Sequence, residues 1–256
     1  MIRYIIDGVS DQGYKKEVNQ DACFAGKTIT SSGEVCFAVV CDGMGGLEAG
    51  ELASSTIVQE LRNWFYEKCE LGEDWIIDTY SIHNDLLKVI FECNKSLIQY
   101  GNENGFTMGS TVVTGLITPE MVYVMNVGDS RAYRQKDGLY KLSRDHSVVG
   151  EDIDSGIITE EEAKKDNRNN VLTQAVGVFE DIEPFFKGYP MQEGCYIFCT
   201  DGFYNHVTNK EIIDNVNYDI RSEKEIKDGL SVIVSLNRER GERDDISAIV
   251  INVDKT

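Results

Sequence analysis

The chain has 256 residues, of which 44 are acidic and 25 are basic, and its formal net charge is -19. A field of this sign repels phosphate backbones and anionic lipid surfaces, so it argues against nucleic acid or a membrane as a partner. The charge favours basic substrates, or it serves only solubility. Hydrophobic residues make up 41% of the chain and no stretch has the composition of a linker, so we expect one domain over residues 1–256.

In the first half of the sequence, predicted strands are followed by two predicted helices. Apolar runs rich in β-branched and aromatic residues predict strands at residues 1–9, 21–25 and 35–41. Two long segments with helical spacing follow, at residues 48–66 and 80–100. Trp64 and Trp75 are expected in the core.

The second half returns to strands, at residues 110–117, 121–127, 131–135 and 140–142. The pair Asp137-Gly138 between the last two predicts a hairpin turn. A polar segment at 145–170 holds one short helix at 159–166, for which Thr159 is the expected N-cap. A strand at 196–200, helices at 209–216 and 223–240, and a strand at 246–253 complete the chain. Grouped helices favour an α+β fold with antiparallel sheets and outer helices.

The seven cysteines are odd in number and show no metal-binding Cys-x-x-Cys spacing. Several lie in or beside apolar strands, where a free cysteine serves as a small hydrophobic residue. No signal peptide and no run of transmembrane length is found. The sequence therefore predicts a cytoplasmic protein.

Four acidic segments lie next to predicted strands. Asp42, Asp129 and Asp201 each follow an apolar run, and Asp244 precedes one. Taken singly, these aspartates have ordinary structural explanations. Asp42 could lie in a tight turn before a helix, Asp129 could be a loop aspartate paired with Arg131, and Asp244 could lie in a solvated turn. Together they would repel one another unless a hard divalent cation held them through oxygen.

Two metal ions bridged by carboxylates can activate water for attack at phosphorus. The three histidines, His83, His146 and His206, show no zinc spacing. We therefore expect Mg²⁺ or Mn²⁺ rather than zinc. We expect His146 to be a structural hydrogen-bonding residue and not a base.

The motifs resemble those of the metal-dependent serine/threonine protein phosphatases of the protein phosphatase 2C family, in its bacterial form. The matching segments run in order along nearly the whole chain: Asn19-Gln20-Asp21, Asp42-Gly43-Met44-Gly45-Gly46, Gly109-Ser110-Thr111, Val127-Gly128-Asp129-Ser130-Arg131, Asp145-His146-Ser147, Leu172 to Gly177, Thr200-Asp201-Gly202 and Asp244-Asp245-Ile246-Ser247. The resemblance implies a four-layer α-β-β-α sandwich, in which two antiparallel sheets are flanked by helices. It also implies a variable flap at about residues 145–170.

The resemblance further implies a role for each matching residue. Asp42 would bridge two metal ions, and Gly43 would offer its carbonyl to the second of them. Asp201 and Asp244 would complete the shell of the first ion, so these two and Asp42 would be the catalytic residues.

Two more carboxylates would belong to the site. Asp21 would lie close to the ions, as an acceptor behind the ligands or through a water. Asp129, with Asp201, matches a third and weaker metal position.

Three positions depart from the family pattern. Lys16 stands where an arginine usually holds the substrate phosphate, and lysine keeps the charge but loses the bidentate fork. Met44 stands where eukaryotic relatives carry a histidine. Asp245 replaces a usual asparagine and adds a negative charge near the ions.

The leading hypothesis is hydrolysis of phosphoserine and phosphothreonine in proteins by a metal-activated water, without a phosphoenzyme. The substrates would be the products of a serine/threonine kinase. The first alternative is a weakly active or inactive phosphatase-fold module that binds or regulates. A second alternative is a regulatory phosphatase with one specific partner, such as an anti-anti-sigma factor or a secretion-system component.

Overall fold

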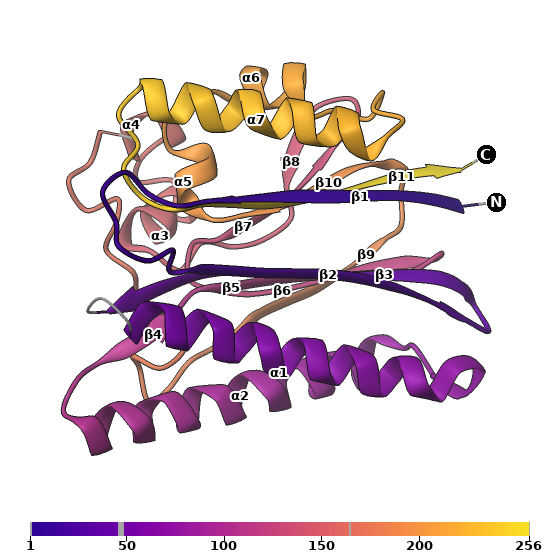
Figure 1. Cartoon of the computed structure of the whole chain (residues 1–256), viewed down its shortest axis with the longest axis horizontal. Coiled ribbons are helices and arrows are strands. Elements are labelled where there is room, and N and C mark those ends of the chain that lie inside the picture. The colour runs from indigo at the N-terminus through magenta and orange to yellow at the C-terminus, as the bar shows by residue number, and fades with distance from the viewer. Residues whose placement is uncertain (1, 46–48, 164, 256) are drawn as a thin grey trace.

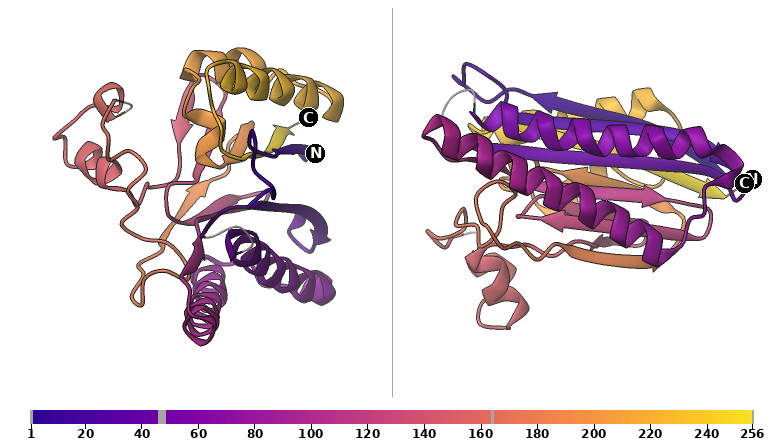
Figure 2. Two further views of the ribbon diagram at one scale, coloured as in Figure 1. Left: turned by 60° about the vertical axis from the view of Figure 1, so that its left-hand side comes forward. Right: turned by 90° about the horizontal axis from the view of Figure 1, so that it is seen from below.

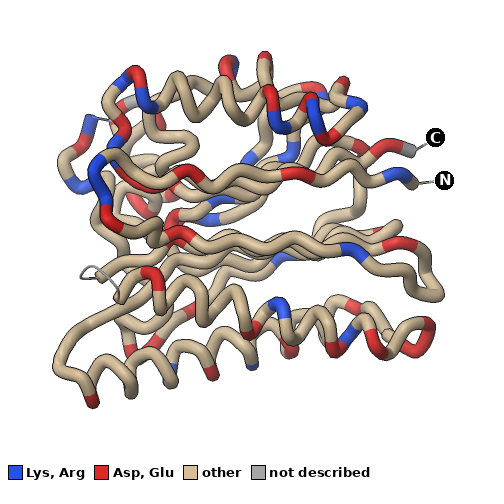
Figure 3. Tube along the Cα trace, viewed as in Figure 1, with Lys and Arg blue, Asp and Glu red and all other residues tan. Residues whose placement is uncertain are grey.

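Two antiparallel sheets packed face to face, with helices on both outer faces, form the molecule in the computed structural model (Figure 1). The structure describes residues 2–45, 49–163 and 165–255. Its layers run helix, sheet, sheet, helix, so the predicted four-layer sandwich is confirmed. Acidic residues are spread over both helical layers and the strand ends (Figure 3).

The first sheet has the strand order β1-β11-β10-β7-β8, and the second has the order β2-β3-β5-β6-β9, with β4 paired to β3. All these pairs are antiparallel. The strands are β1 (Ile2–Asp11), β2 (Asp21–Thr30), β3 (Gly33–Gly45), β4 (Met108–Ser110), β5 (Val112–Ile117), β6 (Met121–Val127), β7 (Arg131–Gln135), β8 (Leu139–Lys141), β9 (Phe185–Pro190), β10 (Gly194–Cys199) and β11 (Ile246–Lys255).

Two long helices cover one face of the sandwich and several shorter ones cover the other. The helices are α1 (Ala49–Leu71), α2 (Thr79–Asn104), α3 (Val148–Asp154), α4 (Glu160–Ala163), α5 (Asp201–Tyr204), α6 (Asn209–Asn215) and α7 (Glu223–Glu239), with a 3₁₀ turn at η1 (Gly72–Asp74). Helices α1 and α2 lie side by side across the second sheet, whereas α3 and α4 project beside the sandwich (Figure 2). No helix of the described chain has both the length and the apolarity needed to cross a lipid bilayer.

Three apolar clusters hold the layers together. One joins α1 and α2 to the second sheet and contains both tryptophans, Trp64 and Trp75, as predicted. Another lies between α5, α6, α7 and the first sheet. The third fills the space between the two sheets. The cysteines at 36, 41, 195 and 199 are buried and free, as expected of small hydrophobic residues.

Several predicted boundaries were wrong. The strand predicted to end before Asp42 continues as β3 through Gly45, because Gly43 to Gly45 pair with β4. The strand predicted at 110–117 is two strands, β4 and β5. The short helix predicted at 159–166 covers only Glu160–Ala163, although Thr159 does cap it by accepting a hydrogen bond from the Glu162 N–H. Gly46, residue 1 and the predicted helix start at 48 lie outside the described residues.

Other elements were not predicted. Strand β9 lies at a sheet edge, all of its residues are at least partly exposed, and Lys187 and Gly188 interrupt its apolar residues. Helices α3 and α5 are each shorter than two turns, too short to produce a clear period. The hairpin at Asp137-Gly138 is confirmed, since β7 and β8 pair directly across it.

We expect Gly115→Ala to destabilise the fold by about 1–3 kcal/mol, the cost typical of overpacking a core. A Cβ on Gly115 of β5 would lie 2.0 Å from Cζ of Phe198, whose ring is fully buried between the sheets. The midpoint of urea unfolding measures the effect. Gly188→Ala is the matched control, since its nearest contact, 3.2 Å away, is the flexible end of Met121. Equal midpoints for the two variants would contradict this account of the sheet contact.

Candidate metal and phosphate site

Asp21 and Asp42 face each other on neighbouring strands. They are register partners in the antiparallel pair of β2 and β3. Backbone hydrogen bonds with two other segments hold Asp42 and Gly43 in place. The Thr111 N–H donates to the Asp42 carbonyl at 2.9 Å, and the Gly43 N–H donates to the Gln20 carbonyl at 3.1 Å. Sheet pairing therefore brings together two carboxylates that are separated by a hairpin in the sequence.

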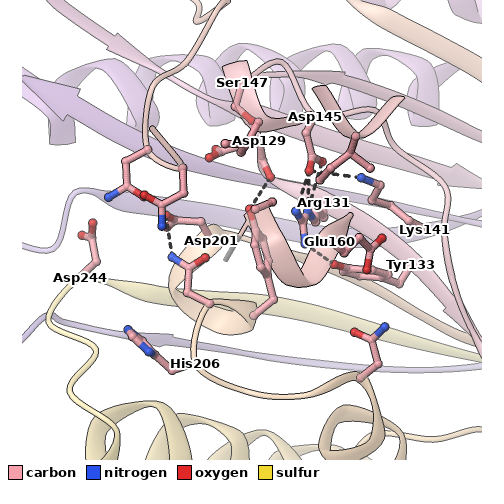
Figure 4. A pocket seen from close by; sticks show the side chains of 18 of the residues that line it. Asp129, Arg131, Tyr133, Lys141, Asp145, Ser147, Glu160, Asp201, His206 and Asp244 are labelled. Atoms are coloured by element: carbon pink, nitrogen blue, oxygen red, sulfur yellow. Dashed lines mark hydrogen bonds and ion pairs between the residues drawn. The ribbon is translucent and has the colours of Figure 1, made fainter. Parts of the chain in front are cut away.

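Asp129, Asp201 and Asp244 line a single cavity of about 310 Å³. The first sheet delivers two of them: Asp129 precedes β7, and Asp201 begins α5 directly after β10. Asp244 lies just before β11, which is the neighbour of β10. Figure 4 shows the three carboxylates on one side of the cavity, opposite Lys141 and Tyr133. The convergence expected of these residues is thus present at one end of the sandwich.

The electrostatics of Asp42 link the two groups of carboxylates. Burial raises the pKa of Asp42 well above its ordinary value, and the negative charges of Asp21, Asp201, Asp244 and Asp129 raise it further. All five carboxylates therefore share one electrostatic region.

The pKa values of three other carboxylates in the region are also raised. Burial and neighbouring aspartates raise the pKa of Asp21 and of Asp129 to about 8, and that of Asp201 to about 6. The Oδ1 atoms of Asp21 and Asp201 are buried and have no hydrogen-bond partner among the residues that the structure describes. An all-oxygen donor set with unpaired buried oxygens and excess negative charge has the chemistry that hard divalent cations bind.

The ligand set itself stays a prediction. Within residues 2–45, 49–163 and 165–255, no three His, Cys, Asp or Glu side chains already stand as a group that could hold a metal ion. Asp244 instead forms an ion pair with Lys16. The Nζ of Lys16 also lies 2.9 Å from Oδ2 of Asp245. Lys16, predicted to bind the substrate phosphate, is thus placed at the edge of the carboxylate region.

The alternative partner for Asp129, Arg131, is engaged elsewhere. Arg131 binds both oxygens of Asp145, and its guanidinium stacks 3.7 Å from the ring centre of Tyr204. Tyr204 in turn donates its hydroxyl to the Asp129 carbonyl at 3.0 Å. The loop reading of Asp129 as a partner of Arg131 was therefore wrong. The Arg131–Tyr204 stack joins the loop that carries Asp129 to the helix that begins with Asp201.

His146 has the structural role that was expected. Its Nδ1 accepts a hydrogen bond of 3.2 Å from the Gly128 N–H. Burial and the charge of Arg144 lower its pKa, so the neutral form that accepts this bond is favoured. His146 thereby fixes the turn before Asp129.

Sequence reasoning missed Arg238, in the last turn of α7. Its guanidinium binds the Asp11 carboxylate at 2.6 Å and donates to the carbonyls of Gln12 and Asp244 at 3.1 and 2.6 Å. It therefore clamps the segment before Lys16 to the segment before β11. An arginine on an amphipathic helix gives no sequence signal that separates this role from a solvated surface charge.

We expect Arg238→Gln to lower kcat/KM by about 10- to 100-fold, the range found for groups that orient metal ligands. The loss is expected because two segments beside the carboxylate region lose their shared donor. Steady-state hydrolysis of a phosphothreonine peptide measures it. The control is Arg240→Gln, which removes an exposed ion pair with Glu211 from the same helix end. If both variants had the same activity, the clamp would have no functional role.

Comparison with known proteins agrees with this architecture. Residues 12–222 match the family model described as protein phosphatase 2C. The serine/threonine phosphatase stp of Listeria innocua is 30% identical over 248 residues, covering 94% of this chain and 93% of that protein. The crystal structure of the serine/threonine phosphatase Stp1 from Staphylococcus aureus has a TM-score of 0.81 at 27% identity, with 98% and 95% of the two chains covered. The PstP catalytic domain, solved in complex with two manganese ions, has a TM-score of 0.79 at 23% identity, with both chains fully covered.

Proposed function

Because the chain belongs to the protein phosphatase 2C family and is a serine/threonine protein phosphatase, we propose that it hydrolyses phosphoserine and phosphothreonine at a centre of two divalent ions. The observation that carries the dinuclear centre is the shared electrostatic region of five aspartates, in which burial and mutual repulsion raise the pKa of Asp42. Positive charge added to such an array stabilises its ionised carboxylates.

The proposed residue roles are those that the family resemblance implies, and the neighbouring positions of the side chains support them. Asp42, Asp201 and Asp244 would hold the ions together with the carbonyl of Gly43. Asp21 would lie behind them, and its Oδ2 already accepts a hydrogen bond of 3.0 Å from Thr200.

Asp129 would serve a third, weaker ion with Asp201. Both line the cavity, and the hydroxyl of Tyr204 holds the Asp129 backbone beside α5. This arrangement supports the assignment because the Asp129 backbone is held beside the helix that begins with Asp201.

Bound divalent ions supply Lewis-acid charge for the phosphoryl oxygens and lower the pKa of water. The chain's own residues contribute position and charge. Lys16 adds a cation at the edge of the region, and its bonds to Asp244 and Asp245 outweigh burial and raise its pKa, so it stays protonated. The buried Thr200 hydroxyl donates to the Asp21 carboxylate. The backbone of Asp42 is held on both of its polar groups, because its N–H donates to the Thr111 hydroxyl and its carbonyl accepts the Ser110 hydroxyl.

Phosphoproteins made by a serine/threonine kinase would be the substrates, in the cytoplasm. Mn²⁺ and Mg²⁺ both satisfy an all-oxygen ligand set. The cavity beside the carboxylates is bordered by residues of the segment 145–170, including Val149, Ile153 and Glu160. This position supports its assignment as a flap, and the flap would contact the residues that flank the phosphorylated side chain.

The test is hydrolysis of matched phosphothreonine, phosphoserine and phosphotyrosine peptides by the purified protein, with and without Mn²⁺ or Mg²⁺. We expect metal-dependent release of phosphate from the first two peptides. Activity that survives complete chelation would refute the dinuclear centre. A protein that binds the peptides but releases no phosphate with either metal would be the inactive module instead.

A further inference from the structure

Asp245 is a buried carboxylate that accepts three donors, and it is not among the proposed metal ligands. Its side chain is only 1% exposed. Oδ1 accepts the Gly13 N–H at 2.7 Å, and Oδ2 accepts the Gln20 N–H at 2.9 Å and the Lys16 ammonium at 2.9 Å. Both ends of the segment 13–20 and its central cation are therefore tied to a single side chain.

The same segment is packed tightly on the strand end that carries Asp245. A Cβ on Gly13 would lie 2.4 Å from the carbonyl oxygen of Arg243, so only glycine allows this approach. Lys15, just before Lys16, has a left-handed backbone with φ of 67°, which is uncommon for a residue other than glycine. Figure 3 shows basic residues of the β1–β2 loop close to acidic residues at this end of the sandwich.

Asp245 also contacts the other side of the site. A Cβ on Gly202 would lie 2.2 Å from the Asp245 carbonyl oxygen. The backbone of Asp245 is thus packed against the residue that follows Asp201. The Asp245 side chain contacts Lys16, and its backbone packs against the turn that follows Asp201. Asp245 therefore connects the loop of Lys16 with this turn.

We infer that Asp245 is a positioning residue that holds Lys16 and its loop in place for the substrate phosphate, and that the two act as one unit. This inference rests on the proposed function, because it takes Lys16 as the phosphate-side cation. Asp245 itself contacts neither substrate nor metal in this assignment. Its contribution would appear in substrate affinity and would pass through Lys16.

An aspartate suits this position because a carboxylate only accepts hydrogen bonds. Three donors converge on its two oxygens. An asparagine would turn its NH₂ group toward at least one of these donors and leave that donor without an acceptor. A carboxylate buried this far also needs a counter-charge, which Lys16 provides.

The experiment is a double-mutant cycle with Asp245→Asn and Lys16→Ala, measured as KM and kcat for a phosphothreonine peptide at saturating Mn²⁺. We expect Asp245→Asn to raise KM about tenfold in the natural background, with a smaller change in kcat. In the Lys16→Ala background the same substitution should change KM less than about twofold. The control is Asp254→Asn at the opposite end of β11, where the carboxylate accepts the Tyr218 hydroxyl at 3.0 Å.

The outcomes separate the two proposals. If the natural protein shows no metal-dependent hydrolysis, the proposed function fails before the cycle begins. If the natural protein is active and Asp245→Asn changes KM equally in both backgrounds, or not at all, the positioning role is overturned while the phosphatase assignment stands.

Amide hydrogen exchange gives a readout that needs neither metal nor substrate. We expect slow exchange at the Gly13 and Gln20 amides in the natural protein, and faster exchange at both in Asp245→Asn but not in Asp254→Asn. Unchanged exchange in Asp245→Asn would overturn the inference. If Asp245→Asn does not fold, amide exchange in the natural protein tests the inference by itself. Fast exchange at the Gly13 and Gln20 amides would show that they are not bonded to Asp245 and would overturn the inference.

Discussion

Asp42→Asn is expected to lower kcat by about three orders of magnitude or more, the scale reached when a group that acts in the transition state is removed. The pKa of Asp42 is raised by burial and also by four other aspartates of the region. The substitution removes one charge and keeps the size of the side chain. Hydrolysis of a phosphothreonine peptide, with kcat and KM determined separately, measures the loss.

The same substitution should leave the metal-free fold at least as stable as the natural one. Asn at position 42 removes a carboxylate that its acidic neighbours repel when it is ionised, so the thermal midpoint in EDTA should stay level or rise. Loss of activity without loss of stability would separate a functional role from a structural one. Asp137→Asn, in the exposed β7–β8 turn, is the control for both measurements. A mild effect of Asp42→Asn on kcat would argue against a bridging role.

Removal of metal is expected to abolish phosphatase activity and to make stability fall as pH rises. The raised pKa values of Asp21 and Asp129, about 8, mean that the folded metal-free chain holds these protons more tightly than the unfolded chain does. Their contribution to stability is therefore fully present below about pH 4, the ordinary value for an aspartate. It is lost progressively as pH rises to about 8, because the ionised forms are repelled and desolvated in the fold.

Added Mn²⁺ should reverse this trend, because a metal binds the ionised carboxylates and displaces their protons. At saturating metal we expect the thermal midpoint at pH 8 to rise by about 5–10 °C, and by less at pH 5.5. Differential scanning fluorimetry at the two pH values, with EDTA or Mn²⁺, measures both effects. Ca²⁺-free buffers with Na⁺ at matched ionic strength are the control for simple screening. A metal-induced rise that is equal at both pH values would contradict the link between raised pKa and metal binding.

Buried strands were predicted from the sequence more accurately than edge strands. Continuous apolar runs predicted β6 and β10 closely because both are buried on two faces. Strand β9 escaped prediction because it is an edge strand with mixed exposure. The extension of β3 past Asp42 depends on pairing with β4, more than 60 residues away, and no local pattern encodes that contact.

Residues that support the site were harder to predict than the candidate ligands. Asp42, Asp129, Asp201 and Asp244 stand beside apolar strands, so their position follows from the order of the chain. The partner of Arg131 could not be predicted in this way. Both Asp129 and Asp145 are close enough in sequence, and only the fold places Asp145 against the guanidinium.

The sequence by itself determined the family, the antiparallel sandwich and the carboxylates at the strand ends, because strand periodicity and acidic motifs are local properties of the chain. Only the tertiary structure decided what surrounds those carboxylates. Lys16 meets Asp245, and Arg238 meets Asp11, across more than 220 residues. Such contacts depend on which strand ends and helix termini the packed sheets bring together, and that is a property of the whole fold.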